Sequence, residues 1–167
     1  RSEIKQVVGL DFTAEMVHLV DEKTRRKGLQ NSISYVVGDA LTLPFSDDEF
    51  VCATVGFGVR NFVDLPVALS ELRRVVQPGG RVVILEIVRP DGRGILSRLF
   101  RTYFRFVTPW IGLFLAGDRE AYTYLPESVG EFLSAKELTS RMLASQFCDI
   151  QVQSVAMGTV SIHVGQV

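Results

Sequence analysis

The stretch that decides the fold is Arg74–Glu86, with the sequence RVVQPGGRVVILE. Its first residues complete an apolar pattern at helical spacing that starts at Leu65, and Pro78-Gly79-Gly80 then stops the helix. The run Val82–Leu85 is continuously apolar, which is typical of a strand that is buried on both faces. The stretch therefore predicts a helix that leads directly into a buried strand over residues 81–88.

The same alternation of strand and helix is predicted elsewhere in the chain. Short apolar or β-branched runs predict strands at residues 7–11, 33–37, 50–55, 150–155 and 159–164. Thr13, Asp64 and Ser134 are residue types that cap helices, and they predict three helix starts, the last helix running to Phe147. This order favours a mostly parallel α/β sheet, closed by an antiparallel hairpin that turns at Met157-Gly158.

Composition is that of an ordinary globular domain. The 167 residues are 47% hydrophobic and 22% charged, which is enough for one domain with a buried core. The formal net charge of -1 indicates no bulk attraction to nucleic acid, so no nucleic-acid partner is predicted. Cys52 and Cys148 are far apart, and His18 and His163 add no metal-ligand spacing, so no metal site is predicted.

Acidic residues follow two successive predicted strands. Asp11 ends the first strand, and Asp39 follows the second in Gly38-Asp39-Ala40. Ligands of open α/β sheets bind at the carboxyl ends of strands, so Asp11 could accept hydrogen bonds from ribose hydroxyls and Asp39 from an adenine amine. Ala40 would add a backbone N–H, and Phe12 would pack either beside the adenine or in the core. The alternative is that Asp11 caps a helix and Asp39 belongs to a simple turn.

A glycine-rich turn with the sequence GFGVRN follows the third strand at residues 56–61. Gly56 would let a ligand approach the backbone closely, because glycine has no Cβ. Arg60 offers a charged fork of donors, and Asn61 offers an amide that both donates and accepts. The alternative is an ordinary loop that carries a surface arginine.

Five segments resemble motifs of class I, S-adenosylmethionine-dependent methyltransferases, and more narrowly of the ubiquinone/menaquinone C-methyltransferase family. These segments are Leu43-Pro44-Phe45, Phe57–Asn61, Arg74–Glu86, Gly117–Ser128 and Val160–Gly165. The resemblance covers nearly the whole chain. The sequence departs from the family pattern at Gln77, Val88 and Val51, which bears on the substrate and leaves the acids Asp11 and Asp39 unaffected.

The resemblance implies a Rossmann-like class I methyltransferase sheet that lacks its first strand and the glycine-rich loop. Residues 1–167 would form one partial domain, with a helical insertion that covers the substrate at about residues 94–133. In that fold the first strand lies between the strands predicted at 7–11 and 50–55. We therefore expect two strand edges without partners, and we expect this chain to be a fragment or to be completed by another polypeptide.

The resemblance also implies an enzyme. It would use S-adenosylmethionine to methylate a ring carbon of a prenylated quinol in menaquinone or ubiquinone biosynthesis, and demethylmenaquinol is the favoured substrate. Two alternatives are a class I methyltransferase for another small lipophilic molecule and a non-catalytic scaffold in a quinone-synthesis complex. The implied site comprises the catalytic residues Arg60 and Asn61, the cofactor-binding residues Asp11, Phe12, Asp39, Ala40 and Gly56, and the substrate-binding residues Phe57, Tyr122 and Tyr124, although the two tyrosines could equally pack in the core.

The segment Leu96–Leu115 is rich in aromatic residues, and Arg98, Arg101 and Arg105 repeat on one helical face. One interpretation is a lid helix that packs on the core or on a second subunit of a homodimer. The other is a surface for an isoprenoid tail or for the membrane interface, with the arginines near lipid phosphates. We therefore expect a cytoplasmic protein with peripheral membrane contact, located in the mitochondrial matrix or a plastid if the source is a eukaryote.

Overall fold

The computed structural model describes residues 6–89 and 132–167. Tyr122, Tyr124 and the segment 96–115 lie outside the described residues, as does nearly all of the insertion predicted at 94–133. The described helices and strands are β1 (Val7–Asp11), α1 (Ala14–Arg26), β2 (Ile33–Val37), β3 (Phe50–Gly56), α2 (Leu65–Val75), β4 (Val76–Ile87), α6 (Ala135–Ala144), β5 (Cys148–Val155) and β6 (Val160–Gln166). Single 3-10 turns lie at Val59–Asn61 and Ala156–Gly158.

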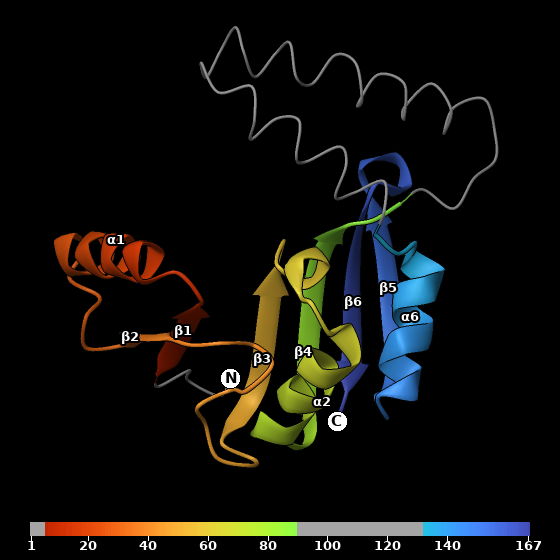
Figure 1. The fold of residues 1–167 in the computed structure, drawn as a ribbon, viewed down its shortest axis with the longest axis horizontal. Helices are drawn as coiled ribbons and strands as arrows, with labels where there is room; N and C mark the ends of the chain where they lie inside the picture. The colour runs from red at the N-terminus through yellow and green to blue at the C-terminus, as the bar shows by residue number, and fades with distance from the viewer. Residues whose placement is uncertain (1–5, 90–131) are drawn as a thin grey trace, which may run out of the picture.

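The described strands form two sheets. β1 pairs in parallel with β2, and the larger sheet has the order β3-β4-β6-β5. In the larger sheet β3 is parallel to β4, whereas β6 is antiparallel to both β4 and β5, so the predicted closing hairpin is confirmed. Figure 1 shows the β1–β2 pair beyond the β3 edge of this sheet. Within residues 6–89 and 132–167, β1 and β3 each have a hydrogen-bonded neighbour on one edge alone, and so do β2 and β5.

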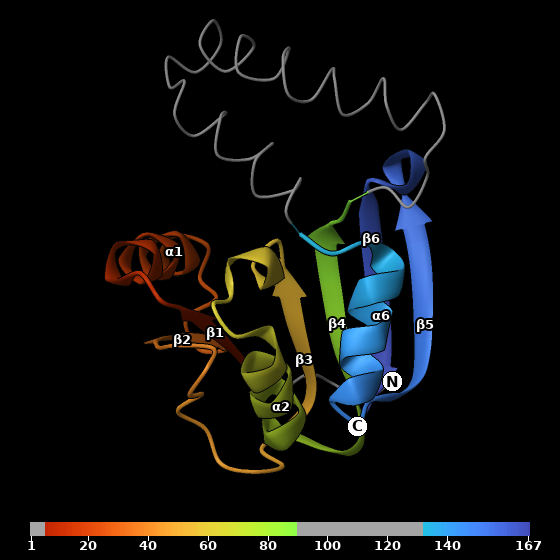
Figure 2. The ribbon, with the colours of Figure 1, turned by 45° about the vertical axis from the view of Figure 1, so that its right-hand side comes forward.

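The core lies between the larger sheet and its two helices. Figure 2 shows that α2 and α6 cover the same face of that sheet. Alternate residues of β4 are buried on this face, and they pack against apolar residues of both helices. The buried residues of this cluster are Val59, Leu69, Leu72, Val75, Val76, Val82, Ile84, Leu138, Met142 and Phe147.

No residue separates α2 from β4, so β4 begins earlier than the predicted residue 81. The helix ends at Val75, and Val76 already pairs with Phe50 of β3. The next partners are Cys52 and Arg81, so residues 77–80 bulge out before the regular ladder begins at the predicted residue. Gly80 fits this bulge because a Cβ there would lie 2.6 Å from the Val76 side chain.

Two of the three predicted helix caps are confirmed. Asp64 accepts a hydrogen bond from the Val67 amide, and Ser134 forms a capping box with Glu137. The side-chain cap predicted for Thr13 is wrong, because the threonine side chain makes no cap hydrogen bond. The prediction that the last helix runs to Phe147 is also wrong: α6 ends at Ala144, since Gln146 takes a left-handed φ of 65°. No helix in the described ranges is long and apolar enough to cross a bilayer.

Candidate active site

The carboxyl ends of β1 and β2 bring Asp11 and Asp39 to one edge of the smaller sheet. The Gly38 amide donates to the Asp11 carbonyl at 3.0 Å, so Asp39 follows one residue after this bond. One oxygen of each carboxylate is used locally: Asp11 Oδ1 accepts from the Thr13 amide at 2.8 Å, and Asp39 Oδ1 accepts from the Leu41 amide at 2.9 Å. The other oxygen of each has no partner in the described ranges. Local turn formation and ligand binding are therefore compatible here.

Three further predicted cofactor residues lie at or just after the ends of β1, β2 and β3. Phe12 follows β1 and is 76% exposed as a residue, so it is not part of the described core. Ala40 follows Asp39 and is half-buried. Gly56 ends β3, and a Cβ built on it would meet no atom of the described residues within 4 Å. No described residue therefore stands in the way of a ligand at Gly56, and the predicted cofactor contact there stays a prediction.

The loop after β3 holds Phe57 in an unusual conformation. Its φ is 57°, in the left-handed region that residues with a Cβ seldom adopt. The Phe57 amide donates to the carbonyl of Leu85 in β4 at 2.8 Å, which anchors the loop to the neighbouring strand. The 3-10 turn Val59–Asn61 follows, with Val59 buried in the core and Asn61 exposed. Phe57 itself is half-exposed, so it is placed where a ligand could contact its ring.

Arg60 is held by a buried carboxylate that sequence reasoning left without a role. Arg60 Nη1 donates to Glu86 Oε1 at 2.5 Å, and the Arg60 amide donates to Glu86 Oε2 at 3.1 Å. The side chain of Glu86 is 0% exposed, and that of Arg60 is 11% exposed. The signal that could have revealed this pair is a glutamate directly after the apolar run of β4, because a buried charge needs a partner.

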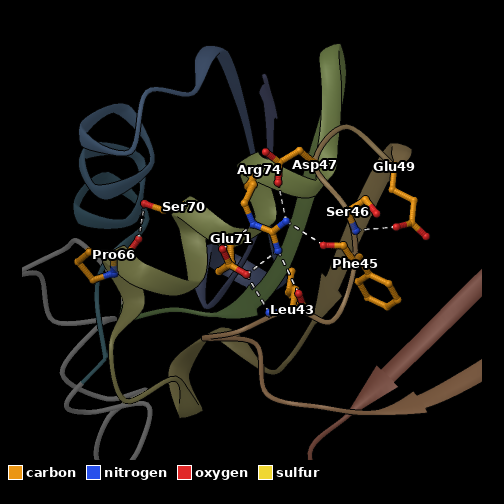
Figure 3. A network of polar contacts seen from close by, with 9 residues as sticks. All are labelled: Leu43, Phe45, Ser46, Asp47, Glu49, Pro66, Ser70, Glu71 and Arg74. Atoms are coloured by element: carbon orange, nitrogen blue, oxygen red, sulfur yellow. Dashed lines mark hydrogen bonds and ion pairs between the residues drawn. The ribbon is translucent and has the colours of Figure 1, made fainter.

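A second arginine fixes the segment that follows Asp39. Figure 3 shows the Arg74 guanidinium of α2 surrounded by acceptors. It donates to Glu71 through Nε and Nη2 at 2.7 and 2.8 Å, and to the carbonyls of Phe45 and Leu43 at 2.8 and 3.0 Å. Nη1 also donates to Asp47 at 2.8 Å, and Glu71 accepts from the Leu43 amide. The hydrogen bond from Arg74 is the main cause that lowers the pKa of Glu71, and burial opposes it.

Two hollows among the described residues lie away from the strand ends just described. One of about 740 Å³ lies between α1 and the beginning of β2, where His18, Arg25 and Tyr35 are among its lining residues. In the described ranges no group of three His, Cys, Asp or Glu side chains is placed to hold a metal ion.

Comparison with known proteins identifies the family of this chain. The model of the ubiE/COQ5 methyltransferase family matches residues 2–167. The chain belongs to this family. It is similar to the demethylmenaquinone methyltransferase of Thermus thermophilus, at 40% identity over 160 residues that cover 96% of this chain and 71% of the relative. The demethylmenaquinone methyltransferase of Deinococcus radiodurans is 41% identical over 160 residues, covering 96% of this chain and 65% of that protein.

Solved structures support the same class of fold. A SAM-dependent methyltransferase from Aquifex aeolicus superimposes with a TM-score of 0.63 at 19% identity, over 99% of this chain and 70% of that one. The chain is therefore a methyltransferase with a Rossmann-like class I fold, and family and fold together imply S-adenosylmethionine as its cofactor. The residues present fit this group: among the described residues, Asp11 and Asp39 each keep a carboxylate oxygen without a partner, and no atom would contact a Cβ at Gly56.

Proposed function

We propose that this chain catalyses the S-adenosylmethionine-dependent C-methylation of a prenylated quinol in menaquinone biosynthesis, with demethylmenaquinol as the substrate. The observation that carries the proposal is the 36–41% identity to demethylmenaquinone methyltransferases over almost the whole chain. It favours the naphthoquinol over the benzoquinol of ubiquinone synthesis. It also favours an enzyme over a scaffold, because the acids expected to hold the cofactor are present at the strand ends.

Binding of the cofactor falls to the residues at the ends of β1, β2 and β3. S-adenosylmethionine, when bound, supplies a methyl group activated by the positive sulfonium. Asp11 would accept from the ribose hydroxyls and Asp39 from the adenine amine, with the Ala40 amide as a donor. The exposed ring of Phe12 offers an apolar face to the adenine, and Gly56 leaves room for close approach.

Alignment of the quinol falls to the loop after β3. Phe57 presents a half-exposed ring, and Asn61 presents an amide that could orient a quinol oxygen. Methyl transfer to carbon depends on alignment and on exclusion of water, and a loop held in one conformation serves both. Stabilisation of charge on a quinol oxygen by Arg60 stays a prediction. The substrate contacts of Tyr122 and Tyr124, dimer formation and the membrane contact of residues 96–115 also stay predictions.

The proposal is tested by incubating the full-length protein with S-adenosylmethionine carrying an isotope-labelled methyl group. Demethylmenaquinol and the matching benzoquinol, with equal prenyl tails, are the two acceptors. We expect label in the ring of the naphthoquinol product, and slower transfer to the benzoquinol. Transfer to neither acceptor, with S-adenosylhomocysteine still binding, would point to another lipophilic substrate. Absence of S-adenosylhomocysteine binding would leave the scaffold as the better account.

A further inference from the structure

The left-handed conformation of Phe57 is held from both sides of the residue. Its amide donates to the Leu85 carbonyl at 2.8 Å, and its carbonyl accepts from Arg60 Nη1 at 3.0 Å. A φ of 57° is strained for a residue with a Cβ, and such a conformation persists where the surroundings fix it. Strain of this kind concentrates at functional sites. The contact with Arg60 is thus part of what keeps the loop in its present shape.

Glu86 in turn fixes Arg60. Its carboxylate accepts from the Arg60 amide, from Arg60 Nη1 and from the Ile87 amide at 3.1, 2.5 and 2.9 Å. The carboxylate is fully buried, and a buried charge that lost its partner would be strongly destabilising. Because Arg60 Nη1 donates both to Glu86 and to the Phe57 carbonyl, it connects the end of β4 to the strained loop.

We propose that Glu86 is a positioning residue for methyl transfer. Glu86 holds Arg60, Arg60 holds the Phe57 carbonyl, and this chain of contacts sets where the Phe57 ring and the Asn61 amide stand at the end of β3. The inference rests on the proposed function, because it takes the loop to face the methyl acceptor. It gives Arg60 Nη1 a role in the geometry of the loop, since this nitrogen donates to both Glu86 and Phe57, and it leaves the predicted role of the other guanidinium nitrogens as it stands.

The first test is Glu86→Gln in the full-length protein. Glutamine keeps the shape and one acceptor for Arg60 Nη1, but it loses the charge and places an amide nitrogen where the Arg60 amide donates. We expect kcat for the quinol to fall about tenfold or more, because hydrogen bonds to charged groups are the strong ones. KM for S-adenosylmethionine should change by less than about twofold, since Asp11 and Asp39 lie on other strands. Hydrogen exchange of the Phe57 and Arg60 amides should accelerate.

The second test removes the strain that the contacts oppose. Glycine adopts a positive φ freely, so in the Phe57→Gly background the same Glu86→Gln change should cost much less in kcat. Glu22→Gln is the matched control, because it neutralises a carboxylate in an exposed pair with Arg26. We expect it to leave kcat and both loop amides unchanged.

The proposal is overturned if Glu86→Gln lowers only the unfolding temperature while kcat and loop exchange stay at the wild-type values. An equal loss of kcat in both Phe57 backgrounds would overturn it too. Should Glu86→Gln not fold, Arg60→Lys replaces it, since lysine keeps the charge but its side chain ends one atom short of Nη1, the single nitrogen that donates to both Glu86 and the Phe57 carbonyl. It should lower kcat while sparing KM for S-adenosylmethionine, and an unchanged kcat would refute the proposal. If the wild-type protein methylates no quinol, the proposed function fails, whereas loop exchange in these variants still tests the positioning role.

Discussion

Replacing Arg74 with methionine should destabilise the fold more than any other change to a half-exposed charge in the described network. All five N–H groups of the guanidinium have acceptors, and two of these acceptors are backbone carbonyls of the segment 43–47. Methionine keeps most of the apolar stem, so the variant reports the loss of the polar contacts rather than of packing. Figure 3 draws the hydrogen bonds of this arginine together with neighbouring contacts.

The expected loss follows from the burial of each partner. The carbonyls of Leu43 and Phe45 are half-buried, and losing a charged donor costs about 1 kcal/mol for each. The Glu71 side chain is 20% exposed, so its pair contributes roughly 1 kcal/mol, whereas Asp47 is 75% exposed and contributes close to nothing. The sum is about 3 kcal/mol, which lowers the melting temperature of a domain of this size by roughly 6–12 °C.

The assay is urea unfolding of the full-length protein, followed by circular dichroism. Arg73→Met is the matched control, because it makes the same change one residue earlier, where the Arg73 side chain donates a single long hydrogen bond of 3.4 Å to Gln146. Arg74→Lys should lose about half as much as Arg74→Met, since it keeps the charge without the fork. The reasoning is refuted if Arg74→Met and Arg73→Met unfold at the same urea concentration.

The effect of pH on this variant has a definite sign. Arg74 lowers the pKa of Glu71 in the folded protein, so this pair adds stability above the ordinary glutamate pKa of about 4.3. That stability is lost as the pH falls through the folded-state pKa of Glu71. The difference between wild type and Arg74→Met should therefore shrink below about pH 4.

Three further predictions address the site and the core. Asp11→Asn keeps the acceptor for the Thr13 amide but loses the charge, so S-adenosylhomocysteine should bind about tenfold more weakly by calorimetry with an unchanged melting temperature; equal affinity would contradict the ribose role. Gly56→Ala should also fold normally, because its Cβ would meet no atom of the described residues within 4 Å, yet it should weaken the same ligand by occupying the space beside Gly56. Burial lowers the pKa of His163 despite its hydrogen bond to the Ala135 carbonyl, so the free energy of unfolding should fall as the pH drops below about 6.5. In urea titrations at several pH values, His163→Gln should reduce this dependence on pH. An unchanged dependence would exclude the histidine as its source.

The sequence was sufficient to predict the elements whose signals are local. The apolar runs at Val7–Asp11 and Ile33–Val37 coincide with β1 and β2, and Ser134 with Glu137 forms the predicted capping box. The separation of β1 from β3 agrees with the family resemblance, which places a further strand between these two. These predictions succeed because spacing along the chain determines which face a residue occupies.

Contacts between distant residues could not be predicted in this way. Phe57 reads as an ordinary apolar residue, and nothing in its neighbours indicates a positive φ. Thr13 reads as a cap, but Asp11 two residues earlier takes its amide and its own hydroxyl is left out of the cap. In both cases the result depends on which nearby polar groups form hydrogen bonds with one another in the folded structure. Several such pairings are compatible with the same local sequence, so the sequence alone does not select one of them.

The two arginine–carboxylate pairs show that an arginine in a motif typical of catalysis can also serve to hold a loop in place. Arg74 and Glu71 lie three residues apart on α2 at a half-exposed position, so water can replace a lost partner. Loss of this pair should therefore lower mainly the free energy of unfolding. Arg60 and Glu86 come from different elements, 26 residues apart, and both are nearly or fully buried. Water cannot easily replace either partner there, so the pair restricts the loop to one shape. Arg60 Nη1 is used twice within the protein, whereas the buried Arg60 Nε has no hydrogen-bond partner among the described residues. The arrangement therefore supports alignment of the acceptor by the loop, and charge stabilisation by the other guanidinium nitrogens of Arg60 stays a prediction.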